Sequence, residues 1–293
     1  METATDTIFQ IDADPVVHTY NNHPNYLVQY NEQNQNDLCA VYFSSNKIYY
    51  PNTEKVFTED IIQKNRYEWY GLRIKEAHKH IFVRDIKKQW YQTGINATVN
   101  SPAALAGFLA AETKGYRVIT IGSSAGGFAA ILFGQLLHAE RTYCFNAQYE
   151  INSLLTDSDK KTNPLIFRNA GNPELRKYFD TKGFITHPER IYYFYSNKSN
   201  WDIEQHAHIK DLGINVISFN TNTHGPPVLK CSMSAVLSLS EQQLKGFVGK
   251  ENKPFWFSCK LVGFPVTVAG VYDQVIAKVK NKTRNLMSTG KLH

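Results

Sequence analysis

Segments with the pattern of β-strands alternate with helical segments along the middle of this chain, and this alternation restricts the possible folds more than any other feature. Apolar runs typical of buried strands occupy residues 79–86, 116–122, 141–148, 190–197 and 214–220. Helical patterns fall between them at residues 100–115, 125–140 and 201–213. Helices of this length usually join parallel strands of one sheet. The sequence therefore predicts an α/β fold with a mostly parallel central sheet and helices on both faces.

The remaining segments are less regular. Residues 150–188 are polar, and we interpret them as an insertion or cap over one edge of the sheet, with one short helix within residues 169–179. No repeat and no Gly/Ser linker divides the chain, so we expect a single α/β-hydrolase-like domain over residues 1–293. Other expected elements are β-type runs at 7–11, 25–30 and 37–45, a helical region at 227–249, and a terminal hairpin followed by a helix within 255–280.

Composition excludes several classes of protein. The chain has 293 residues, of which 42% are hydrophobic, and this is enough apolar material for one large core or two modest ones. No run approaches the ~20 apolar residues that span a bilayer, and the polar N-terminus lacks a signal-peptide pattern, so we expect a cytoplasmic protein. The cysteines are far apart and form no CxxC pair, which predicts reduced thiols and no metal site. They are Cys39, Cys144, Cys231 and Cys259.

The net charge of +6 is distributed unevenly along the chain. Residues 278–293 form a basic tail that contains no acid. Its basic residues are Lys278, Lys280, Lys282, Arg284 and Lys291. Such a tail attracts anionic polymers, nucleic acid or lipid headgroups, and the alternative is a solvated chain end.

The segment GSSAG at residues 122–126 fits the pattern G-x-S-x-G with Ser124 in the middle. It lies where a predicted strand ends and a predicted helix begins, which is the setting of a nucleophile elbow. Gly122 and Gly126 would allow the strand and the helix to approach each other closely, and Ser123 would point elsewhere. The alternatives are an ordinary glycine turn or a phosphate-binding loop at a helix N-terminus.

A serine nucleophile needs a base and a residue that orients the base, and this fold places them later in the chain as acid and then histidine. Asp202 follows the strand predicted at 190–197, and His224 follows the strand predicted at 214–220. We therefore predict Ser124, Asp202 and His224 as a catalytic triad. Glu204 could replace Asp202, which could also be a plain helix N-terminal acid. His206 and His208 fall inside a predicted helix, where surface histidines are usual.

Backbone amides would form the oxyanion hole. We predict the amide of Ala125 as one donor, with the second from the loop after the strand at 79–86, near Asp85 and Ile86. Asp85 could also fix this loop by accepting backbone hydrogen bonds. Trp90 and Tyr91 are candidate walls of a substrate pocket, and core packing is their alternative role.

Several segments together resemble the α/β-hydrolase superfamily. They are VYFSSN (41–46), FVRDIKKQWYQTGI (82–95), VITIGSSAGGFAAILFG (118–134), YYFYSNKSNWD (192–202), HAHIKDLG (206–213) and TNTHGPP (221–227). More narrowly, the chain resembles members encoded with bacterial capsule and surface-polysaccharide genes, and the hydrolase-like component of the accessory Sec system. The resemblance spans roughly residues 38–230, and Asp85, Trp90 and Tyr91 provide its narrower signal.

This resemblance implies an O-acetyltransferase that moves an acetyl group from acetyl-CoA to a bacterial surface polysaccharide. The basic balance of the chain suits an anionic polysaccharide acceptor, and the basic tail could place the protein at the inner face of the membrane. We also expect no bound cofactor, no metal and no nucleic-acid partner. Two alternatives stay open, a serine esterase or deacetylase of the same fold and a non-catalytic component of a polysaccharide or secretion assembly. Transferase and hydrolase share their first half-reaction, so no motif separates them.

Overall fold

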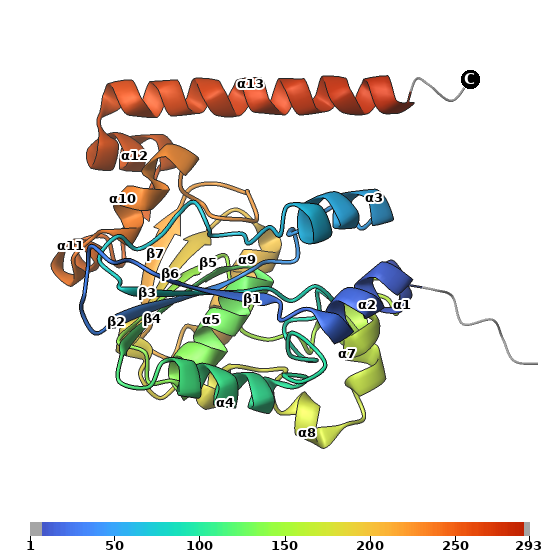
Figure 1. Ribbon diagram of the computed structural model, residues 1–293. Coiled ribbons are helices and arrows are strands. Elements are labelled where there is room, and N and C mark those ends of the chain that lie inside the picture. Colours follow the sequence, from blue (N-terminus) through green and yellow to red (C-terminus); the bar gives the residue numbers. More distant parts are fainter. Residues whose placement is uncertain (1–7, 290–293) are drawn as a thin grey trace, which may run out of the picture.

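A single eight-stranded sheet forms the centre of the protein (Figure 1). The computed structural model describes residues 8–289, and it describes side chains for residues 8–276. The strand order is β1-β3-β2-β4-β5-β6-β7-β8, with β1 antiparallel to β3 and every other neighbouring pair parallel. The strands are β1 (Tyr26–Tyr30), β2 (Leu38–Phe43), β3 (Lys79–Val83), β4 (Arg117–Ser123), β5 (Arg141–Phe145), β6 (Ile191–Ser196), β7 (Asn215–Phe219) and β8 (Glu251–Asn252).

Helices cover both faces of this sheet. The first face packs against α4 (Pro102–Glu112), α5 (Ala125–Leu136) and α9 (Asn200–Ile209). The second face packs against α10 (Met233–Leu237), α11 (Glu241–Lys245), α12 (Pro254–Val262) and the loop at residues 67–77. Because neither face meets water, β2 and β3 are buried along their whole length, and alternate residues contribute to opposite layers. The predicted α/β class, the mostly parallel sheet and the helices on both faces are confirmed.

Two predicted β segments are helical instead. Residues 7–11 were expected as a strand, but α1 (Phe9–Asp12) forms there and packs Phe9 against the rings of Tyr49 and Phe57. The expected hairpin within residues 255–280 is wrong as well, because α12 and α13 (Phe264–Thr289) occupy it. Pro254 begins α12, and Gly263 separates the two helices with φ 83°. The aromatic and β-branched residues there favour strands, but the chain leaves the sheet after β8, and α12 and α13 pack on η4 and on each other instead.

Short helices fill the remaining connections. Residues 150–188 contain α6 (Leu154–Asp157), α7 (Pro164–Asn169), α8 (Pro173–Arg176), η2 (Lys182–Phe184) and η3 (Pro188–Arg190), where one helix was expected. The others are α2 (Asp14–Asn22), α3 (Glu54–Phe57), the π-helix η1 (Thr58–Gln63) and η4 (Lys230–Ser232).

The C-terminal helix α13 extends across the outside of the domain (Figure 1). The side chains of the predicted basic tail, residues 278–293, lie outside the described residues. Within the described part of the chain, no helix is both long and apolar enough to cross a membrane.

Candidate active site

Ser124 lies at a sharp turn between β4 and α5, with φ 54° and ψ −122°. This conformation is unfavourable for a residue with a side chain, and surrounding packing must hold it. A Cβ at Gly122 would lie 1.9 Å from the carbonyl oxygen of Gly126, and a Cβ at Gly126 would lie 2.4 Å from the carbonyl oxygen of Phe43. Both glycines are therefore required by close backbone approach, and they allow the tight strand–turn–helix geometry that carries the serine.

The predicted base and acid lie next to this serine. His224 follows β7, and its Nε2 is 3.0 Å from Ser124 Oγ. Its Nδ1 is 3.0 Å and 3.2 Å from the two carboxylate oxygens of Asp202, which is fully buried in the first turn of α9. With Nδ1–H donating to the carboxylate, Nε2 is left as an acceptor for the serine hydroxyl. The fold thus brings three residues from the carboxyl ends of three parallel strands into one hydrogen-bonded series.

A buried asparagine fixes the loop that carries His224. Asn146 Nδ2 donates to the carbonyl oxygens of Thr223, at 2.9 Å, and Gly225, the residues on either side of the histidine. Its Oδ1 accepts the amide of Ser196 at 2.7 Å. Asn146 follows β5 and has φ 41°, a conformation that asparagine tolerates better than most residues. Sequence reasoning missed this role because an asparagine at a strand end is also an ordinary turn residue.

Gln148 is a second polar residue that the sequence analysis missed. It is buried, and its Nε2 lies 3.3 Å from Ser124 Oγ and 3.4 Å from His224 Nε2. The indole Nε1–H of Trp90 donates to its Oε1 at 3.1 Å. Because an indole can only donate, this contact identifies the amide oxygen as the acceptor and leaves the NH₂ group facing the serine and histidine. The amide oxygen also lies 3.4 Å from Ser124 Oγ, so both ends of the amide are within reach of the serine. Its place just after β5, beside the nucleophile strand, is the only signal that could have suggested it.

Two more side chains contact the histidine directly. The ring of Trp201 stacks on the His224 imidazole, with centroids 4.8 Å apart and an interplanar angle of 25°. Lys47 Nζ donates to the His224 carbonyl oxygen at 3.3 Å. Trp201 directly precedes Asp202, so two adjacent residues at the start of α9 orient the imidazole. Asp202 accepts a hydrogen bond from its Nδ1, and Trp201 stacks on its ring.

The Asp85 carboxylate holds its own loop, as the sequence predicted. One oxygen accepts the amides of Lys87 and Lys88, at 3.0 and 3.1 Å, and the other accepts those of Gln89 and Tyr91, at 2.7 and 2.9 Å. Burial raises the pKa of the Asp85 carboxyl above its usual range, and the amide hydrogen bonds oppose this rise. Burial also lowers the pKa of Lys88 to about 7, against the attraction of Asp85.

Trp90 and Tyr91 have positive φ values of 52° and 59°, and the Tyr91 amide is one of those that donate to Asp85. Both side chains are buried in the core layer of α4 and α5, so neither presents a free face to a substrate. The Tyr91 hydroxyl donates to the Ser44 carbonyl oxygen at 3.0 Å. Their predicted role as pocket walls is therefore replaced by a supporting one, in which Trp90 orients Gln148 and Tyr91 fixes the end of β2.

The loop predicted to supply the second oxyanion donor is not the one beside Ser124. β2 lies between β3 and β4, so the loop after β2, residues 44–47, is adjacent to the nucleophile turn and the Asp85–Ile86 loop is one strand further away. The Asp85 amide already donates to Ser44 Oγ at 3.3 Å, and Ile86 is buried in a separate apolar cluster. The order of the strands along the chain does not give their order in the sheet, and the predicted loop was wrong for this reason.

Three of the four amides in residues 44–47 already have acceptors. The Ser44 amide donates to the Val83 carbonyl oxygen at 3.0 Å, and the Lys47 amide donates to Ser45 Oγ at 3.2 Å. The Ser45 amide donates to the Glu68 carboxylate. Burial raises the pKa of the Glu68 carboxyl. Within the described residues, the Asn46 amide has no such partner. The Ala125 amide is in the first turn of α5, where amides have no intrahelical acceptor.

The residues considered as alternative members of the triad have other surroundings. Glu204 is exposed on α9, and the His206 ring stacks on Tyr195. His208 Nε2 is 3.0 Å from both carboxylate oxygens of Asp180. Their contacts are those of helix surface residues.

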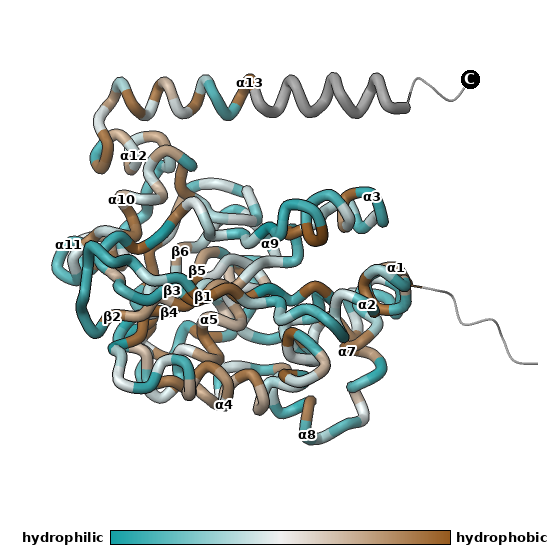
Figure 2. Tube along the Cα trace, in the orientation of Figure 1, coloured by the Kyte–Doolittle hydropathy of each residue, from teal (hydrophilic) through white to brown (hydrophobic). Residues whose placement is uncertain are grey.

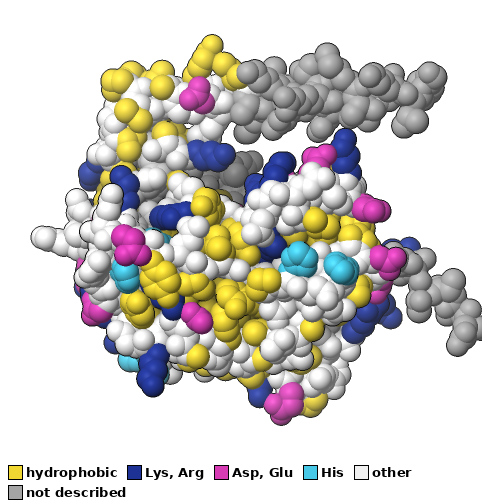
Figure 3. All heavy atoms as spheres, viewed as in Figure 1, with side chains coloured by type: hydrophobic (Ala, Val, Ile, Leu, Met, Phe, Trp, Pro, Cys, Tyr) yellow, Lys and Arg dark blue, Asp and Glu magenta, His cyan; other side chains and the backbone are white. Residues whose placement is uncertain are grey.

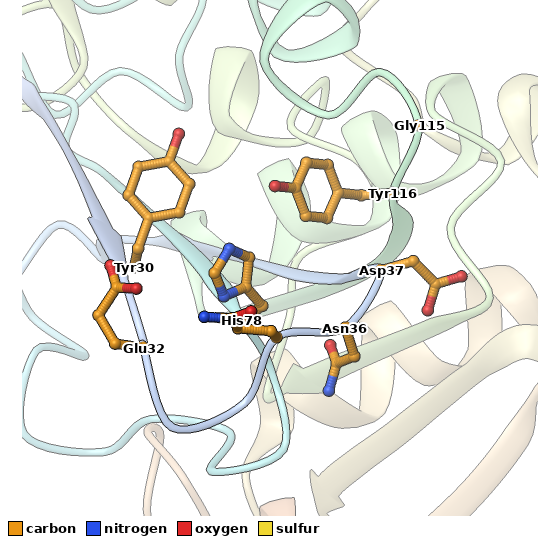
Figure 4. Close-up of a pocket in the computed structure, with 8 residues that line it drawn as sticks. Tyr30, Glu32, Asn36, Asp37, His78, Gly115 and Tyr116 are labelled. Atoms are coloured by element: carbon orange, nitrogen blue, oxygen red, sulfur yellow. The ribbon is translucent and has the colours of Figure 1, made fainter.

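A pocket of about 750 Å³ lies at the end of the sheet where the parallel strands begin, opposite the end that carries Ser124 (Figure 4). It is lined by residues that precede β2, β3 and β4, among them Asp37, His78 and Tyr116. Asp37 is paired with Arg117, and the side-chain Nδ2 of Asn36 donates to the Glu76 carbonyl oxygen. Because parallel strands have their carboxyl ends at the other edge, this pocket is not part of the site around Ser124.

The sheet topology and the serine at its strand–turn–helix junction define an α/β-hydrolase-like protein. No family model and no curated protein matches this sequence. Solved structures with a similar fold include the capsule O-acetyltransferase of Neisseria meningitidis serogroup A, with 10% identity over 67% of this chain and 82% of that chain and a TM-score of 0.46.

Two other similar structures carry different names. The esterase domain of a Rhodothermus marinus protein is 14% identical over 76% of this chain and 92% of that chain, with a TM-score of 0.42. The glycosylation-associated protein complex Gap123 of Streptococcus agalactiae is 12% identical over 66% of this chain and 39% of that chain, with a TM-score of 0.43. These likenesses concern the fold alone, and the named activities belong to those proteins.

Proposed function

We propose that this protein is a serine-dependent acyltransferase that moves an acetyl group from acetyl-CoA to a hydroxyl group of an anionic bacterial surface polysaccharide. The observation that carries this proposal is the hydrogen-bonded series Ser124–His224–Asp202 at the strand–turn–helix junction. The choice of acetyl-CoA as the acetyl donor and of a polysaccharide as the acetyl acceptor depends on the resemblance in sequence to polysaccharide O-acetyltransferases.

The reaction has two half-reactions. In the first, Ser124 Oγ attacks the thioester carbonyl while His224 Nε2 takes the hydroxyl proton, and the collapsing intermediate releases CoA with that proton on sulfur. In the second, a sugar hydroxyl attacks the acetyl-serine ester, loses its proton to His224, and leaves as the acetyl ester while Ser124 regains the proton. Asp202 holds the Nδ1–H of the imidazole in both half-reactions.

The tetrahedral intermediates of both steps need donors for their oxyanion. We assign this role to the amides of Ala125 and Asn46, which replaces the predicted Asp85 and Ile86. Asn46 belongs to the loop that begins against α5, where a Cβ at Gly126 would lie within 2.9 Å of the Ser44 backbone. The Gln148 NH₂ group, directed at Ser124 Oγ, supplies a third donor.

Mass spectrometry of the intact protein after mixing with acetyl-CoA tests the proposal. We expect one acetyl group on the protein, mapped by peptide analysis to Ser124, which disappears when an acceptor polysaccharide is added. If the adduct is lost to water at the same rate with and without the polysaccharide, the protein is an esterase or deacetylase of the same fold. If no adduct forms from acetyl-CoA or from p-nitrophenyl acetate, the proposed catalytic role is wrong and a non-catalytic role replaces it.

Replacing Gln148 with methionine is expected to lower kcat for acetyl transfer on the order of 10²-fold, because the side chain keeps its length but loses the N–H aimed at the reacting serine. KM should change little. Trp90→Phe keeps a buried ring but frees the amide to flip, and we expect a smaller loss of kcat. Steady-state kinetics with acetyl-CoA measure both variants, and a Gln148→Met enzyme with wild-type kcat would remove Gln148 from the mechanism.

A further inference from the structure

The helices α12 and α13 expose a row of large apolar side chains to solvent. Trp256 is 61% exposed, Phe264 56%, Tyr272 65% and Val275 54%. Hydrophobic residues gather on this part of the chain in the hydropathy tube and on the surface shown in space-filling form (Figures 2 and 3). Single-chain proteins rarely expose connected apolar patches larger than a few hundred Å², and such patches usually mark a binding surface.

Helical spacing places most of these residues on one face. Phe264, Val268 (44% exposed), Tyr272 and Val275 follow each other at intervals of four, four and three residues along α13, so their side chains form one stripe. Val266, 50% exposed, lies off this stripe. Asp273 is nine residues from Phe264, which places it on the opposite side of the helix. It is the only acid from Pro254 to the end of the chain. We call the stripe, together with Trp256, the apolar row.

Contacts on another side of these helices hold the apolar row outward. Thr267 is buried, and a Cβ at Gly270 would lie 2.6 Å from Cys231 Cβ, so this side of α13 packs closely on η4. Ser258 of α12 and Ser232 are joined by a hydrogen bond of 2.9 Å between their hydroxyl oxygens. The exposure of the apolar row is therefore fixed by packing and does not reflect a loose helix.

Charge indicates what covers the row. Residues 254–293 contain six Lys or Arg residues and one acid. Five of the basic residues follow the apolar row, in residues 278–293. A second copy of the chain would bring an equally basic segment to this face, and the like charges would repel. An anionic lipid surface offers both an apolar phase for the row and opposite charge for the basic segment, as for amphipathic helices that lie in a membrane interface.

We infer that the apolar row of α12 and α13 binds the surface of a membrane that contains anionic lipids. The row enters the interface between headgroups and acyl chains, with Trp256 and Tyr272 as its amphipathic aromatic anchors. This inference does not depend on the chemistry at Ser124.

Co-sedimentation of the full chain with vesicles tests it. We expect binding to vesicles of phosphatidylcholine with phosphatidylglycerol, at least about tenfold weaker binding to phosphatidylcholine alone, and weaker binding at high salt. The double variant Trp256→Ser/Tyr272→Ser should reduce binding about tenfold or more. Tyr50→Ser is the matched control, because Tyr50 is 74% exposed and belongs to a different part of the chain, and it should bind like the wild type.

A second variant tests the charge separately. Lys280→Gln/Lys282→Gln/Arg284→Gln should weaken binding to anionic vesicles and reduce its dependence on salt. Circular dichroism confirms that each variant is folded, and acetyl transfer to a soluble acceptor should be unchanged. The inference is overturned if the wild type binds neither kind of vesicle, if Tyr50→Ser loses as much binding as the double variant, or if light scattering shows that the apolar row instead holds two copies together.

Discussion

Replacing Ser124 with alanine is expected to lower the rate of acetyl transfer on the order of 10⁴-fold and to abolish the acetyl adduct on the protein. In the proposed mechanism the hydroxyl is the group that attacks the donor, and the neighbouring imidazole, 3.0 Å away, then has no other proton to remove. The fold should survive, because alanine removes one partly buried oxygen and adds nothing to the tight turn. Release of CoA measures the rate, and thermal unfolding measures the stability.

Ser123→Ala is the matched control for this experiment. Ser123 is the adjacent serine of the same motif, but it is buried at the end of β4 and pairs in register with Phe145 of β5. We expect Ser123→Ala to keep the adduct and most of the activity. Equal loss in both variants would point to damage of the turn, and full activity in Ser124→Ala would contradict the proposed mechanism.

Replacing Gly122 with alanine is expected to destabilise the protein by about 4 kcal/mol or more, or to prevent folding. The added Cβ would lie 1.9 Å from the Gly126 carbonyl oxygen and 2.2 Å from its carbonyl carbon. Both atoms belong to the backbone at the start of α5, so relief requires the strand and the helix to separate and Ser124 to move. Urea unfolding followed by circular dichroism measures the loss.

Gly107→Ala provides the control. Gly107 lies in the interior of α4, and a Cβ there would meet no atom within 4 Å. Alanine is the better helix former, so this variant should gain about 0.5–1 kcal/mol of stability. Wild-type stability in Gly122→Ala would show that the turn can relax, and it would remove the packing argument for the motif.

The positions of Ser124, Asp202 and His224 could be predicted because each follows a strand whose pattern is local. Parallel strands end at one edge of the sheet, so three strand ends recognised separately imply three neighbouring side chains. Asp85 was predictable in the same way, since its four acceptor contacts are with amides of the next six residues. These contacts are short-range, and short-range contacts leave a pattern in the sequence.

The loop of the second oxyanion donor could not be found by this reasoning. Among the regular alternating segments, the strand at residues 79–86 directly precedes the strand that carries Ser124. In the structure, however, β4 pairs with β2, which comes from a less regular region of the sequence. Likewise, helices form within residues 7–11 and 255–280 although β1 and β8 lie at the two edges of the sheet, so strand propensity alone did not decide the structure of these segments. Pairing partners are set by the packing of the whole sheet.

The alternation of strands and helices and the glycines around Ser124 are local patterns. Together with the order of serine, acid and histidine at successive strand ends, they were sufficient to predict the fold class and the centre of the candidate site. The order β3-β2-β4, the contact of Gln148 with Trp90 and the hold of Asn146 on the histidine loop emerged only from the folded chain. They join residues far apart in sequence, and a hydrogen bond between distant residues imposes no spacing that a reader of the sequence could recognise.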